Sequence, residues 1–354
     1  MQDGGALMAK GVYGCIFKST LQCKPHTEKT ISPPQSGIPL TKMMLERHAR
    51  AEMAISKLVH RIDGWDRYFA VPGSICVPSE EQSEQDEADM DACPLARKAM
   101  ERDKWSSLRI LSMTYRGKNL NHYAFDLRHM DFRKFCVQLL EAGAQLALHR
   151  LVHRDLHSGN VVVDKWRPRI IDFNLAVHVT PNVSLQQLLH QYNPSLHQES
   201  PDTMLINALE QKMNGWRVLG EFIKKRPTVQ FMMSELSYSH KEMTEDLARM
   251  YSIPCILEGD VDTWFHTYWH TMDSWSIGML ILSRIRLLLS QPAFLAQYTT
   301  YKTILRRVLR QMCDMNPDNR IDCVQALARL DPKNYVLSTK EGIRWMSEKE
   351  PPKK

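Results

Sequence analysis

The sequence predicts an α+β fold with a small, β-rich N-terminal part and a larger, α-helical C-terminal part. Two observations support this prediction. Before residue 118, short apolar segments bounded by Gly and Pro are typical of strands, and they lie at 7–18, 38–44, 68–77 and 108–115. After residue 118, apolar side chains recur with a helical period, at 131–149, 203–225 and 241–251. The 354 residues are enough for a large hydrophobic core.

The composition is that of an ordinary globular protein. Charged residues make up 24% of the chain and hydrophobic residues 43%, which is typical of soluble proteins. The net charge of +6 is mild; it fits a protein that meets phosphate, and it does not indicate nucleic-acid binding. The most apolar run, 275–289, is too short to span a bilayer and contains Arg284 and Arg286. We therefore expect no membrane segment.

Eight cysteines are scattered along the chain without a C-x-x-C pair. This pattern gives no reason to expect a zinc ribbon, and it favours a reduced compartment. The first ten residues, MQDGGALMAK, lack the apolar core of a signal peptide. We therefore expect an intracellular protein of the cytoplasm or nucleus.

The residues that predict chemistry lie in the stretch 151–174, which reads LVHRDLHSGNVVVDKWRPRIIDFN. Asn160 follows Asp155 after five residues, and Asp172 lies twelve residues further on. Phosphoryl transfer needs one carboxylate to orient the attacking hydroxyl group. It also needs an amide oxygen and a second carboxylate to hold the magnesium ions that screen the phosphates. These three residues supply such a set.

Two short apolar runs accompany this set. Val161–Val163 and Ile170–Ile171 each fit a buried strand, with a turn at 166–168 between them. The polar residues would then lie at strand ends and in loops, where a rigid scaffold can position them.

At these positions the chain resembles the eukaryotic-type protein kinases. His153-Arg154-Asp155-Leu156 with Asn160 matches H-R-D-L-x-x-x-N, and Asp172-Phe173-Asn174 matches D-F-G except at its last position. The resemblance implies a bilobal kinase fold that uses ATP and Mg²⁺, or Mn²⁺ in its place. It assigns Asp155 to the substrate hydroxyl group, and Asn160 and Asp172 to the metal. The motifs look most similar to those of kinases from large DNA viruses, which would place the protein in a host cell.

Two positions in this stretch depart from the kinase pattern. His157 stands where Ser/Thr kinases have a Lys that meets the γ-phosphate, a contact that a protonated His could also make. Asn174 replaces the glycine of D-F-G, and Asn tolerates left-handed backbone angles, so the turn would survive. Arg154 would pair with a phosphorylated loop residue. The candidates for that residue are Thr180, Ser184 and Ser195.

The segment 7–18, LMAKGVYGCIFK, resembles the kinase Gly-rich loop, with Ala in place of its first glycine. Glycines let backbone N–H groups approach phosphates without obstruction by side chains. The residues expected to surround the nucleotide are Ala9, Gly11, Tyr13, Gly14 and Ile16. Cys15 is expected near the phosphates as a small side chain, and a reactive thiol is the less favoured alternative.

Lys42 corresponds, by resemblance, to the strand lysine that contacts the α- and β-phosphates of ATP. Residues 43–62 have a helical period and carry Glu52 on an otherwise apolar stripe. A carboxylate in such a place needs a partner, and Lys42 is the natural one. Glu46 is the alternative partner, but an i,i+4 pair with Arg50 explains it better.

The strand expected at 108–115 would lead into the hinge between the lobes. By resemblance, Met113 would guard the adenine pocket, and the backbone of Thr114, Tyr115 and Arg116 would bond to the base. The segment 79–91 is strongly acidic and is expected to be a solvated surface loop.

Three further positions resemble structural motifs of the kinase C-lobe. Ser200-Pro201-Asp202 aligns with A-P-E, and Arg320 with the Arg that pairs with its acidic residue. Asp273 begins D-S-W-S-I-G, which resembles the D-x-W-S-x-G that opens the central helix and holds the catalytic loop. Small-molecule kinases usually lack these motifs, so they favour a protein substrate.

The resemblance divides the chain into an N-lobe, 1–117, and a C-lobe, 118–335, followed by a tail, 336–354, with a charged and frayed end. The C-lobe would carry a helical insert at about 203–272, which is a candidate surface for a protein partner. Within this insert, His266 and His270 are expected to pack among aromatic side chains, because a zinc site would need further ligands.

Three functions are compatible with the sequence. The first is a protein kinase that phosphorylates Ser/Thr hydroxyl groups of a protein substrate. The second is a pseudokinase that acts as a scaffold, and the third is a small-molecule phosphotransferase. The retention of Lys42, Asp155, Asn160 and Asp172 favours an active kinase.

Overall fold

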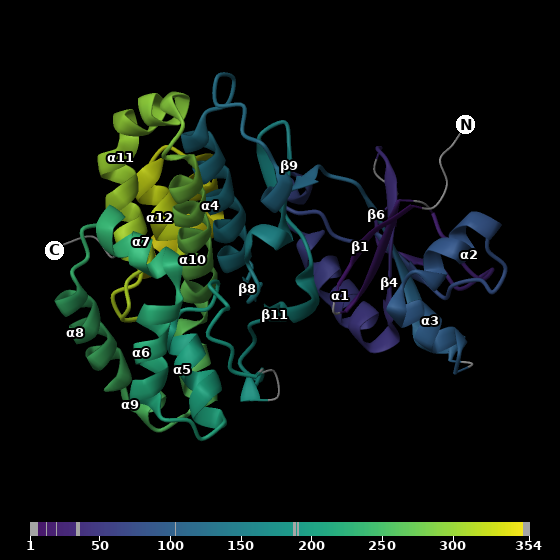
Figure 1. Cartoon of the computed structure of the whole chain (residues 1–354), viewed down its shortest axis with the longest axis horizontal. Helices are drawn as coiled ribbons and strands as arrows, with labels where there is room; N and C mark the ends of the chain where they lie inside the picture. Colours follow the sequence, from purple (N-terminus) through teal and green to yellow (C-terminus); the bar gives the residue numbers. More distant parts are fainter. Residues whose placement is uncertain are drawn as a thin grey trace. The chain divides into compact units, whose positions relative to one another are not determined.

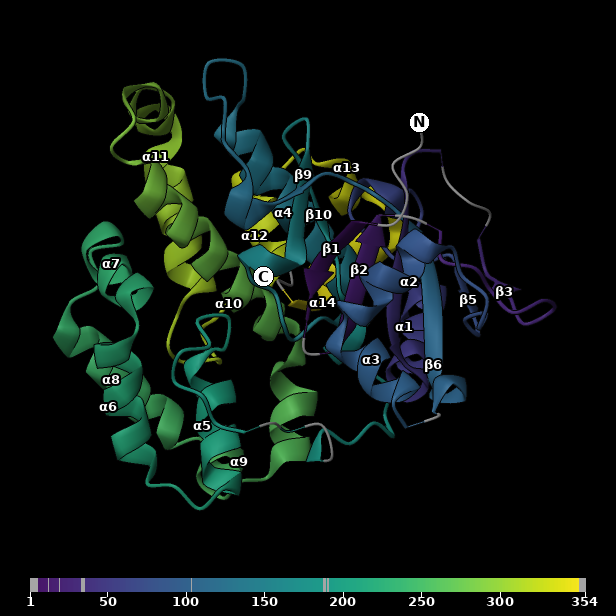
Figure 2. The same ribbon diagram turned by 45° about the vertical axis from the view of Figure 1, so that its right-hand side comes forward.

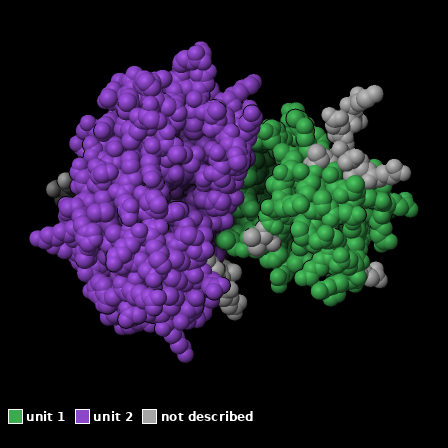
Figure 3. Space-filling view, viewed as in Figure 1, with its two compact units in different colours: residues 1–117, 169–176 green, residues 118–168, 177–354 purple. Residues whose placement is uncertain are grey.

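The computed structural model describes residues 6–11, 13–18, 20–32, 36–102, 104–186, 189 and 191–349. The chain forms two compact units, which are coloured separately in Figure 3. Unit 1 comprises residues 1–117 and 169–176, and unit 2 comprises residues 118–168 and 177–354. Unit 1 is built on an antiparallel sheet and unit 2 is mainly helical, which confirms the predicted kinase-like α+β class.

Unit 1 contains a six-stranded antiparallel sheet in the order β1-β2-β4-β6-β5-β3 (Figure 1). Its strands are β1 (Ala6–Lys10), β2 (Gly14–Lys18), β3 (Lys29–Thr30), β4 (Pro39–Leu45), β5 (Ser74–Cys76) and β6 (Leu108–Thr114). The two central strands pair in register, with Lys42 opposite Leu111. Short 3-10 turns, η1 (Trp65–Arg67) and η2 (Trp105–Ser107), lie in its connections.

Helices cover both faces of this sheet, because side chains alternate between the faces along each strand. Met44 and Leu111 pack against α1 (Glu46–Val59) on one face. Met43 and Ile110 pack on the other face against α2 (Glu84–Asp91) and α3 (Pro94–Met100).

The acidic segment 79–91, expected to be a solvated loop, therefore contains the whole of helix α2. The Ser83 side chain caps α2 by accepting the N–H of Asp86, and Met90 is buried against the sheet. The sequence did not predict this helix, because the acidic residues indicate only that one side of the segment faces solvent.

Two disulfides link the outer layer of unit 1 to its sheet, Cys15–Cys93 and Cys23–Cys76. The expectation that Cys15 is an unpaired side chain near the phosphates is therefore wrong: Cys15 lies on the face opposite Lys42 and is buried. The pairing also departs from the expectation of reduced cysteines. The partners are 78 and 53 residues apart in the sequence, and spacing alone does not reveal such pairs.

Unit 2 is built around the long helix α10 (Val261–Leu288), most of whose residues are buried (Figure 1). The helices of unit 2 that lie outside the predicted insert are α4 (Phe132–Leu148), α11 (Pro292–Met312), α12 (Cys323–Leu330), α13 (Tyr335–Ser338) and α14 (Lys340–Lys349). Its short strands and 3-10 turns are β7 (Lys118–Asn119), η3 (Leu120–His122), β8 (Leu151–Val152), η4 (Ser158–Asn160), β9 (Val161–Asp164) and β11 (Val177–His178). β10 (Arg167–Ile170) crosses the boundary between the units in the sequence.

The predicted helical insert consists of α5 (Pro201–Glu210), α6 (Gly215–Lys225), α7 (Pro227–Glu235), α8 (His240–Tyr251), α9 (Pro254–Leu257) and the start of α10. Figure 2 shows α5, α6, α8 and α9 gathered beside the beginning of α10. The single helix expected at 203–225 is two helices, because Lys212 has a positive φ of 57° and Asn214 caps α6.

Two further expectations about unit 2 are wrong. Asp273 does not open the central helix; α10 begins twelve residues earlier, where Asp260 caps it by accepting the N–H of Thr263. The tail is not frayed over 340–349, because α14 is tied down by a hydrogen bond from Trp345 Nε1 to Asp322 Oδ2 at 2.9 Å. The end of the expected tail, 350–354, lies outside the described residues.

His270 of α10 packs beside Trp345 of α14, with ring centroids 6.3 Å apart. Its pKa is lowered from 6.5 to about 3, first by burial and then by the charges of Lys349 and Arg320. The histidine is therefore neutral at pH 7 and packs among aromatic side chains, as expected. Its partner in the i,i+4 pair, His266, contacts the backbone carbonyl oxygen of Val183 through Nε2 at 3.0 Å.

This half-buried histidine predicts a pH dependence of stability. Between pH 6.5 and pH 3, the unfolded chain binds a proton at His270 that the native chain does not bind. The free energy of unfolding should therefore fall as the pH falls through this window, by up to about 1.4 kcal/mol per pH unit. Relative to the parent, His270→Gln should become progressively more stable as the pH is lowered from 7 to 4.

The measurement is urea unfolding, followed by tryptophan fluorescence, at several pH values. His122→Gln, which changes an exposed histidine, is the matched control and should show no such trend. A constant stability difference between parent and His270→Gln across this range would contradict the prediction.

None of the helices within the described ranges combines the length and the apolar composition needed to cross a bilayer.

Candidate active site

The segment 153–160 of unit 2 carries the H-R-D-L-x-x-x-N motif and is called the catalytic loop. A carboxylate from the middle of α10 binds its backbone. Asp273 Oδ2 accepts the backbone N–H of His153 at 2.7 Å, and Asp273 Oδ1 accepts that of Arg154 at 3.1 Å. Arg154 has a left-handed φ of 67°, which the two bonds to Asp273 help to maintain. Burial raises the pKa of Asp273, and the two N–H groups and the charges of His153 and Arg154 oppose this effect.

Asp155 follows directly on this anchored segment, and both of its carboxylate oxygens accept a hydrogen bond. Asn160 Nδ2 donates to Asp155 Oδ2 at 3.0 Å and to the Asp155 carbonyl oxygen at 2.9 Å. Gln198 Nε2 donates to Asp155 Oδ1 at 2.9 Å. Burial would raise the pKa of Asp155, but the nearby His157 and His153 rings and the Gln198 amide outweigh burial and lower it. The carboxylate is thus kept ionised, as a group that orients a hydroxyl proton must be.

His157 lies beside Asp155 but does not bond to it. Its Nε2 is 3.7 Å from Asp155 Oδ2, beyond hydrogen-bond distance. Its Nδ1 accepts the backbone N–H of Gly159 at 3.0 Å, which places the ring proton of the neutral form on Nε2. A side chain at position 159 would not fit, because a Cβ there would lie 2.5 Å from the His157 ring.

A cavity of about 330 Å³ opens beside the catalytic loop within unit 2. Its walls come from the catalytic loop, from the segment before α5, and from α10 and the start of α7. The lining residues are Leu156, His157, Ser158, Leu196, His197, Gln198, Thr228, Ser276, Met279, Leu280 and Ser283. Hydroxyl, imidazole and apolar groups thus surround a space that reaches the two residues after Asp155, Leu156 and His157.

In unit 1, Lys42 forms the expected pair with Glu52. Lys42 Nζ lies 2.8 Å from Glu52 Oε2 and 3.1 Å from Asp172 Oδ1. Burial alone would lower the pKa of Lys42, but the two carboxylates outweigh burial and raise it. The alternative partner, Glu46, instead contacts Arg50 and Arg109 at the surface. One ammonium group thus faces two carboxylates, which leaves excess negative charge at this position.

Asp172 itself has the left-handed backbone of the D-F-N turn, with φ 65° and ψ 70°. Asn174 lies inside the 3-10 helix η5 (Phe173–Leu175) and needs no left-handed conformation. The expectation that Asn replaces glycine here because it tolerates left-handed backbone angles is therefore wrong. Asn174 Nδ2 instead donates to Asp172 Oδ1 at 2.5 Å. Phe173 packs edge-on against Phe69, with ring centroids 5.8 Å apart.

Two positive φ angles fall at Lys165 and Trp166, between β9 and β10, so the turn lies one residue earlier than the expected 166–168. β10 accordingly begins at Arg167, before the apolar run Ile170–Ile171.

The Gly-rich segment forms the β1–β2 hairpin of unit 1. Ala9 lies in β1 opposite Ile16, beyond a bulge, so alanine is accommodated at the first glycine position. Gly11 and Gly14 close the turn through a backbone bond of 2.8 Å. A Cβ at Gly14 would lie 2.3 Å from the Met43 carbonyl oxygen, so this glycine is needed for close packing of β2 on β4. Tyr13 contacts His48 of α1, with ring centroids 5.2 Å apart.

The expected hinge residues lie at the end of β6. Met113 and Thr114 line a cavity of about 340 Å³ inside unit 1, together with His60 and Trp65. The backbone N–H of Tyr115 donates to the Ile38 carbonyl oxygen at 2.8 Å. That N–H group extends the β4–β6 ladder and is already engaged, while the expected backbone bonds from this segment to a base stay a prediction.

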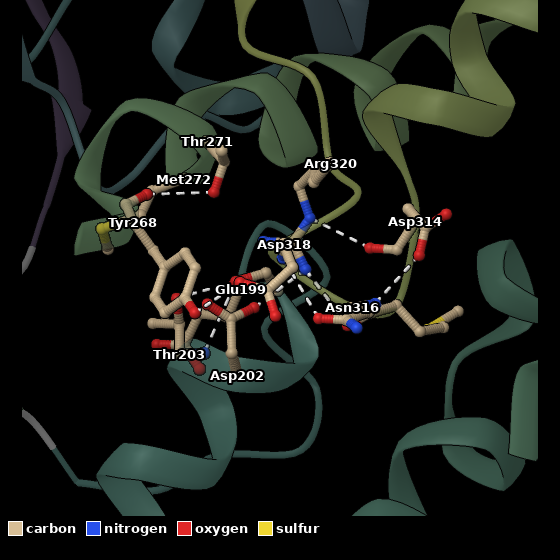
Figure 4. A network of polar contacts seen from close by, with 12 residues as sticks. Glu199, Asp202, Thr203, Tyr268, Thr271, Met272, Asp314, Asn316, Asp318 and Arg320 are labelled. Atoms are coloured by element: carbon tan, nitrogen blue, oxygen red, sulfur yellow. Dashed lines mark hydrogen bonds and ion pairs between the residues drawn. The ribbon is translucent and has the colours of Figure 1, made fainter. Parts of the chain in front are cut away.

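The A-P-E-like segment is anchored in unit 2 as the motifs predicted (Figure 4). Asp202 Oδ1 lies 2.9 Å from Arg320 Nη2, and both side chains are fully buried. Trp264 Nε1 donates to Asp202 Oδ2 at 3.1 Å, and Arg320 Nε donates to the Asp314 carbonyl oxygen at 3.0 Å. The shorter side chain of Asp202 still forms the pair because it starts from the first turn of α5, which Ser200 caps.

Sequence reasoning missed Gln198 and Ser276. Gln198 belongs to no recognised motif, and its closeness to Asp155 depends on a contact between segments 43 residues apart. Ser276 Oγ donates to the Gln198 carbonyl oxygen at 2.7 Å. Ser276 lies within the D-S-W-S-I-G motif, three residues after Asp273, so this motif could have drawn attention to it.

Part of the chain is similar to a known family of enzymes. Residues 87–222 match the family model described as the phosphotransferase enzyme family, APH. The match indicates a phosphotransferase. It includes Asp155, Asn160, Asp172 and Gln198, but leaves out Lys42. No curated protein matches the chain. The resemblance to kinases of large DNA viruses stays a prediction.

Phosphotransferases of this family generally use ATP and Mg²⁺, and the residues present fit both. The Asn160 amide uses its nitrogen on Asp155, which leaves its oxygen as the ligand atom. The excess negative charge around Lys42 favours a cation near Asp172, whose side chain is 34% exposed. Mg²⁺ is usually held by one or two carboxylates together with substrate phosphates, and the Asp172 carboxylate of unit 1 fits that pattern.

Proposed function

We propose that this protein is a protein kinase that transfers the γ-phosphoryl group of ATP to Ser/Thr hydroxyl groups of a protein substrate. The observation that carries the proposal is the pair of bonds from Asp273 to the backbone of His153 and Arg154. These bonds fix the residue before Asp155, so that the carboxylate is presented from a rigid loop. The buried Asp202–Arg320 pair adds support, because it anchors the segment that forms the other wall of the acceptor cavity.

The roles of the residues follow from their contacts. Asp155, ionised and held on both oxygens, orients the attacking hydroxyl group and accepts its proton. Lys42, charged and aligned by Glu52, binds the α- and β-phosphates. Asn160 and Asp172 each offer an oxygen to the metal. Bound Mg²⁺ supplies positive charge that screens the phosphates during the transfer.

A small-molecule phosphotransferase is the second candidate, and the family match over residues 87–222 favours it. The cavity of about 330 Å³ lined by Leu156, His157 and Gln198 is large enough for a small acceptor. A scaffold without catalysis is the third candidate, and the paired Lys42 and the hydrogen-bonded Asp155 speak against it.

One experiment separates these candidates. The purified chain is incubated with Mg²⁺ and ATP labelled at the γ-phosphate, together with a panel of basic and acidic proteins or a panel of aminoglycosides, choline and sugars. Label on serine or threonine, absent with Asp155→Ala, supports the protein kinase. Label only on a small molecule overturns it in favour of the second candidate. Mg²⁺-dependent nucleotide binding without any transfer favours the scaffold.

A further inference from the structure

The Asp155 carboxylate has an amide donor on each oxygen, and only one of the two belongs to the catalytic loop. Asn160, on Oδ2, lies five residues away in the same loop. Gln198, on Oδ1, comes from the segment that precedes α5. An ionised carboxylate only accepts hydrogen bonds, so the Gln198 side chain must direct its nitrogen, and not its oxygen, towards Asp155.

Gln198 reaches Oδ1 from outside the catalytic loop, across 43 residues of sequence. His157 stands at the position where the kinase pattern has a lysine, but its Nε2 is 3.7 Å from Oδ2. Its ring is turned to accept the N–H of Gly159. The second donor that fixes the carboxylate plane is therefore the glutamine.

Gln198 is itself held firmly in place. Its carbonyl oxygen accepts Ser276 Oγ–H at 2.7 Å, and the next residue's carbonyl oxygen accepts Arg226 Nη1 at 2.6 Å. Asp273, one turn before Ser276 on α10, holds the backbone of the catalytic loop. One turn of one helix thus sets both Asp155 and Gln198, and the distance between them does not depend on a mobile loop.

From this geometry we propose that Gln198 is a positioning residue of the phosphoryl-transfer site, which fixes the Asp155 carboxylate in the orientation that receives the acceptor hydroxyl group. Each carboxylate oxygen has two lone pairs, so the bond from Gln198 leaves Oδ1 able to accept the hydroxyl proton as well. Gln198 also lines the cavity of unit 2, together with Leu156 and His157, the two residues that follow Asp155. The inference rests on the proposed function.

Two substitutions test the proposal by steady-state kinetics. Gln198→Ala removes the donor, and kcat should fall about tenfold while KM for ATP stays within about twofold. Gln198→Glu keeps the size of the side chain but places a second carboxylate against Asp155, and kcat should fall at least as far as in Gln198→Ala. Gln191→Ala, an exposed glutamine of the same segment, is the matched control and should keep the parent rate.

The order of the two variants distinguishes positioning from packing. If Gln198 only filled space, Gln198→Glu would retain more activity than Gln198→Ala, and this order would overturn the proposal. So would a parent-like kcat in Gln198→Ala, or a loss of activity that appears only as an increased KM for ATP. Thermal unfolding of each variant shows whether a lower kcat reflects a lost fold.

A second measurement does not depend on catalysis. In ¹⁵N-labelled protein, the side-chain amide signals of Gln198 are identified by their absence in Gln198→Ala. They should move on Asp155→Asn, because the charged acceptor is lost. If the parent transfers no phosphate, the proposed function fails while this signal still tests the Gln198–Asp155 bond. If the parent is active and the signal does not move, only the positioning role of Gln198 fails.

Discussion

Asp155→Asn should lower the rate of phosphoryl transfer by about 10²–10⁴-fold, the usual contribution of a positioned general base. The substitution removes the group that accepts the hydroxyl proton. It also introduces an amide nitrogen where Asn160 and Gln198 both donate, so one of these two amides must rotate to present its oxygen or lose its bond. Because Lys42 belongs to another part of the chain, KM for ATP should change little.

The measurement is steady-state transfer of labelled phosphate, with nucleotide binding followed separately. Asp126→Asn is a suitable control, since Asp126 is an exposed carboxylate that pairs with Arg128 and His129 at the surface. A rate for Asp155→Asn within a few-fold of the parent would remove Asp155 from the mechanism, whatever the substrate.

Arg320→Ala should lower the free energy of unfolding of unit 2 by about 3–5 kcal/mol, the usual effect of breaking one side of a buried ion pair. The substitution leaves Asp202 charged, fully buried and without its cation. It also removes the bond to the Asp314 carbonyl oxygen. Asp202→Asn should be similarly damaging, since it removes the carboxylate that pairs with the buried guanidinium group.

Urea unfolding followed by tryptophan fluorescence is a direct measurement, because the Arg320 guanidinium lies 5.2 Å from the centre of the Trp275 ring. Arg344→Ala removes an exposed i,i+4 partner of Glu348 and should cost no more than about 0.5 kcal/mol. Equal midpoints for Arg320→Ala and Arg344→Ala would show that the buried pair contributes little to stability.

The sequence predicts the parts of the site that local spacing determines. The spacing of five positions from Asp155 to Asn160 is enough to place the amide of Asn160 on the carboxylate of Asp155. The apolar stripe around Glu52 is enough to direct it to Lys42. The Asp202–Arg320 pair spans 118 residues, and it was predictable only because a resemblance supplied the partner.

Where prediction failed, distant parts of the chain decide the local structure. The contact of Gln198 with Asp155 depends on how α10 places two loops, and no local pattern reports it. The helix α2 is hidden by acidic residues on its exposed side, while its buried side packs on a sheet formed elsewhere in the sequence. Likewise, the charged composition of α14 suggested a frayed segment, whereas a hydrogen bond from Trp345 to the distant Asp322 holds the helix in place.

The cysteines of unit 1 and unit 2 differ in their bonding, so a thiol reductant should affect the stability of the two units differently. All four cysteines of unit 1 form disulfides, whereas Cys136, Cys255, Cys313 and Cys323 of unit 2 are free. The two links close nested loops in unit 1, and each such link stabilises a fold by roughly 2–4 kcal/mol. Dithiothreitol in a purification buffer would therefore weaken the part that contains Lys42 and leave the part that contains Asp155 unchanged. An assay with reductant would measure activity with a weakened unit 1, and an assay without reductant would measure it with the disulfides intact. The segment that contains Asp155 would be the same in both.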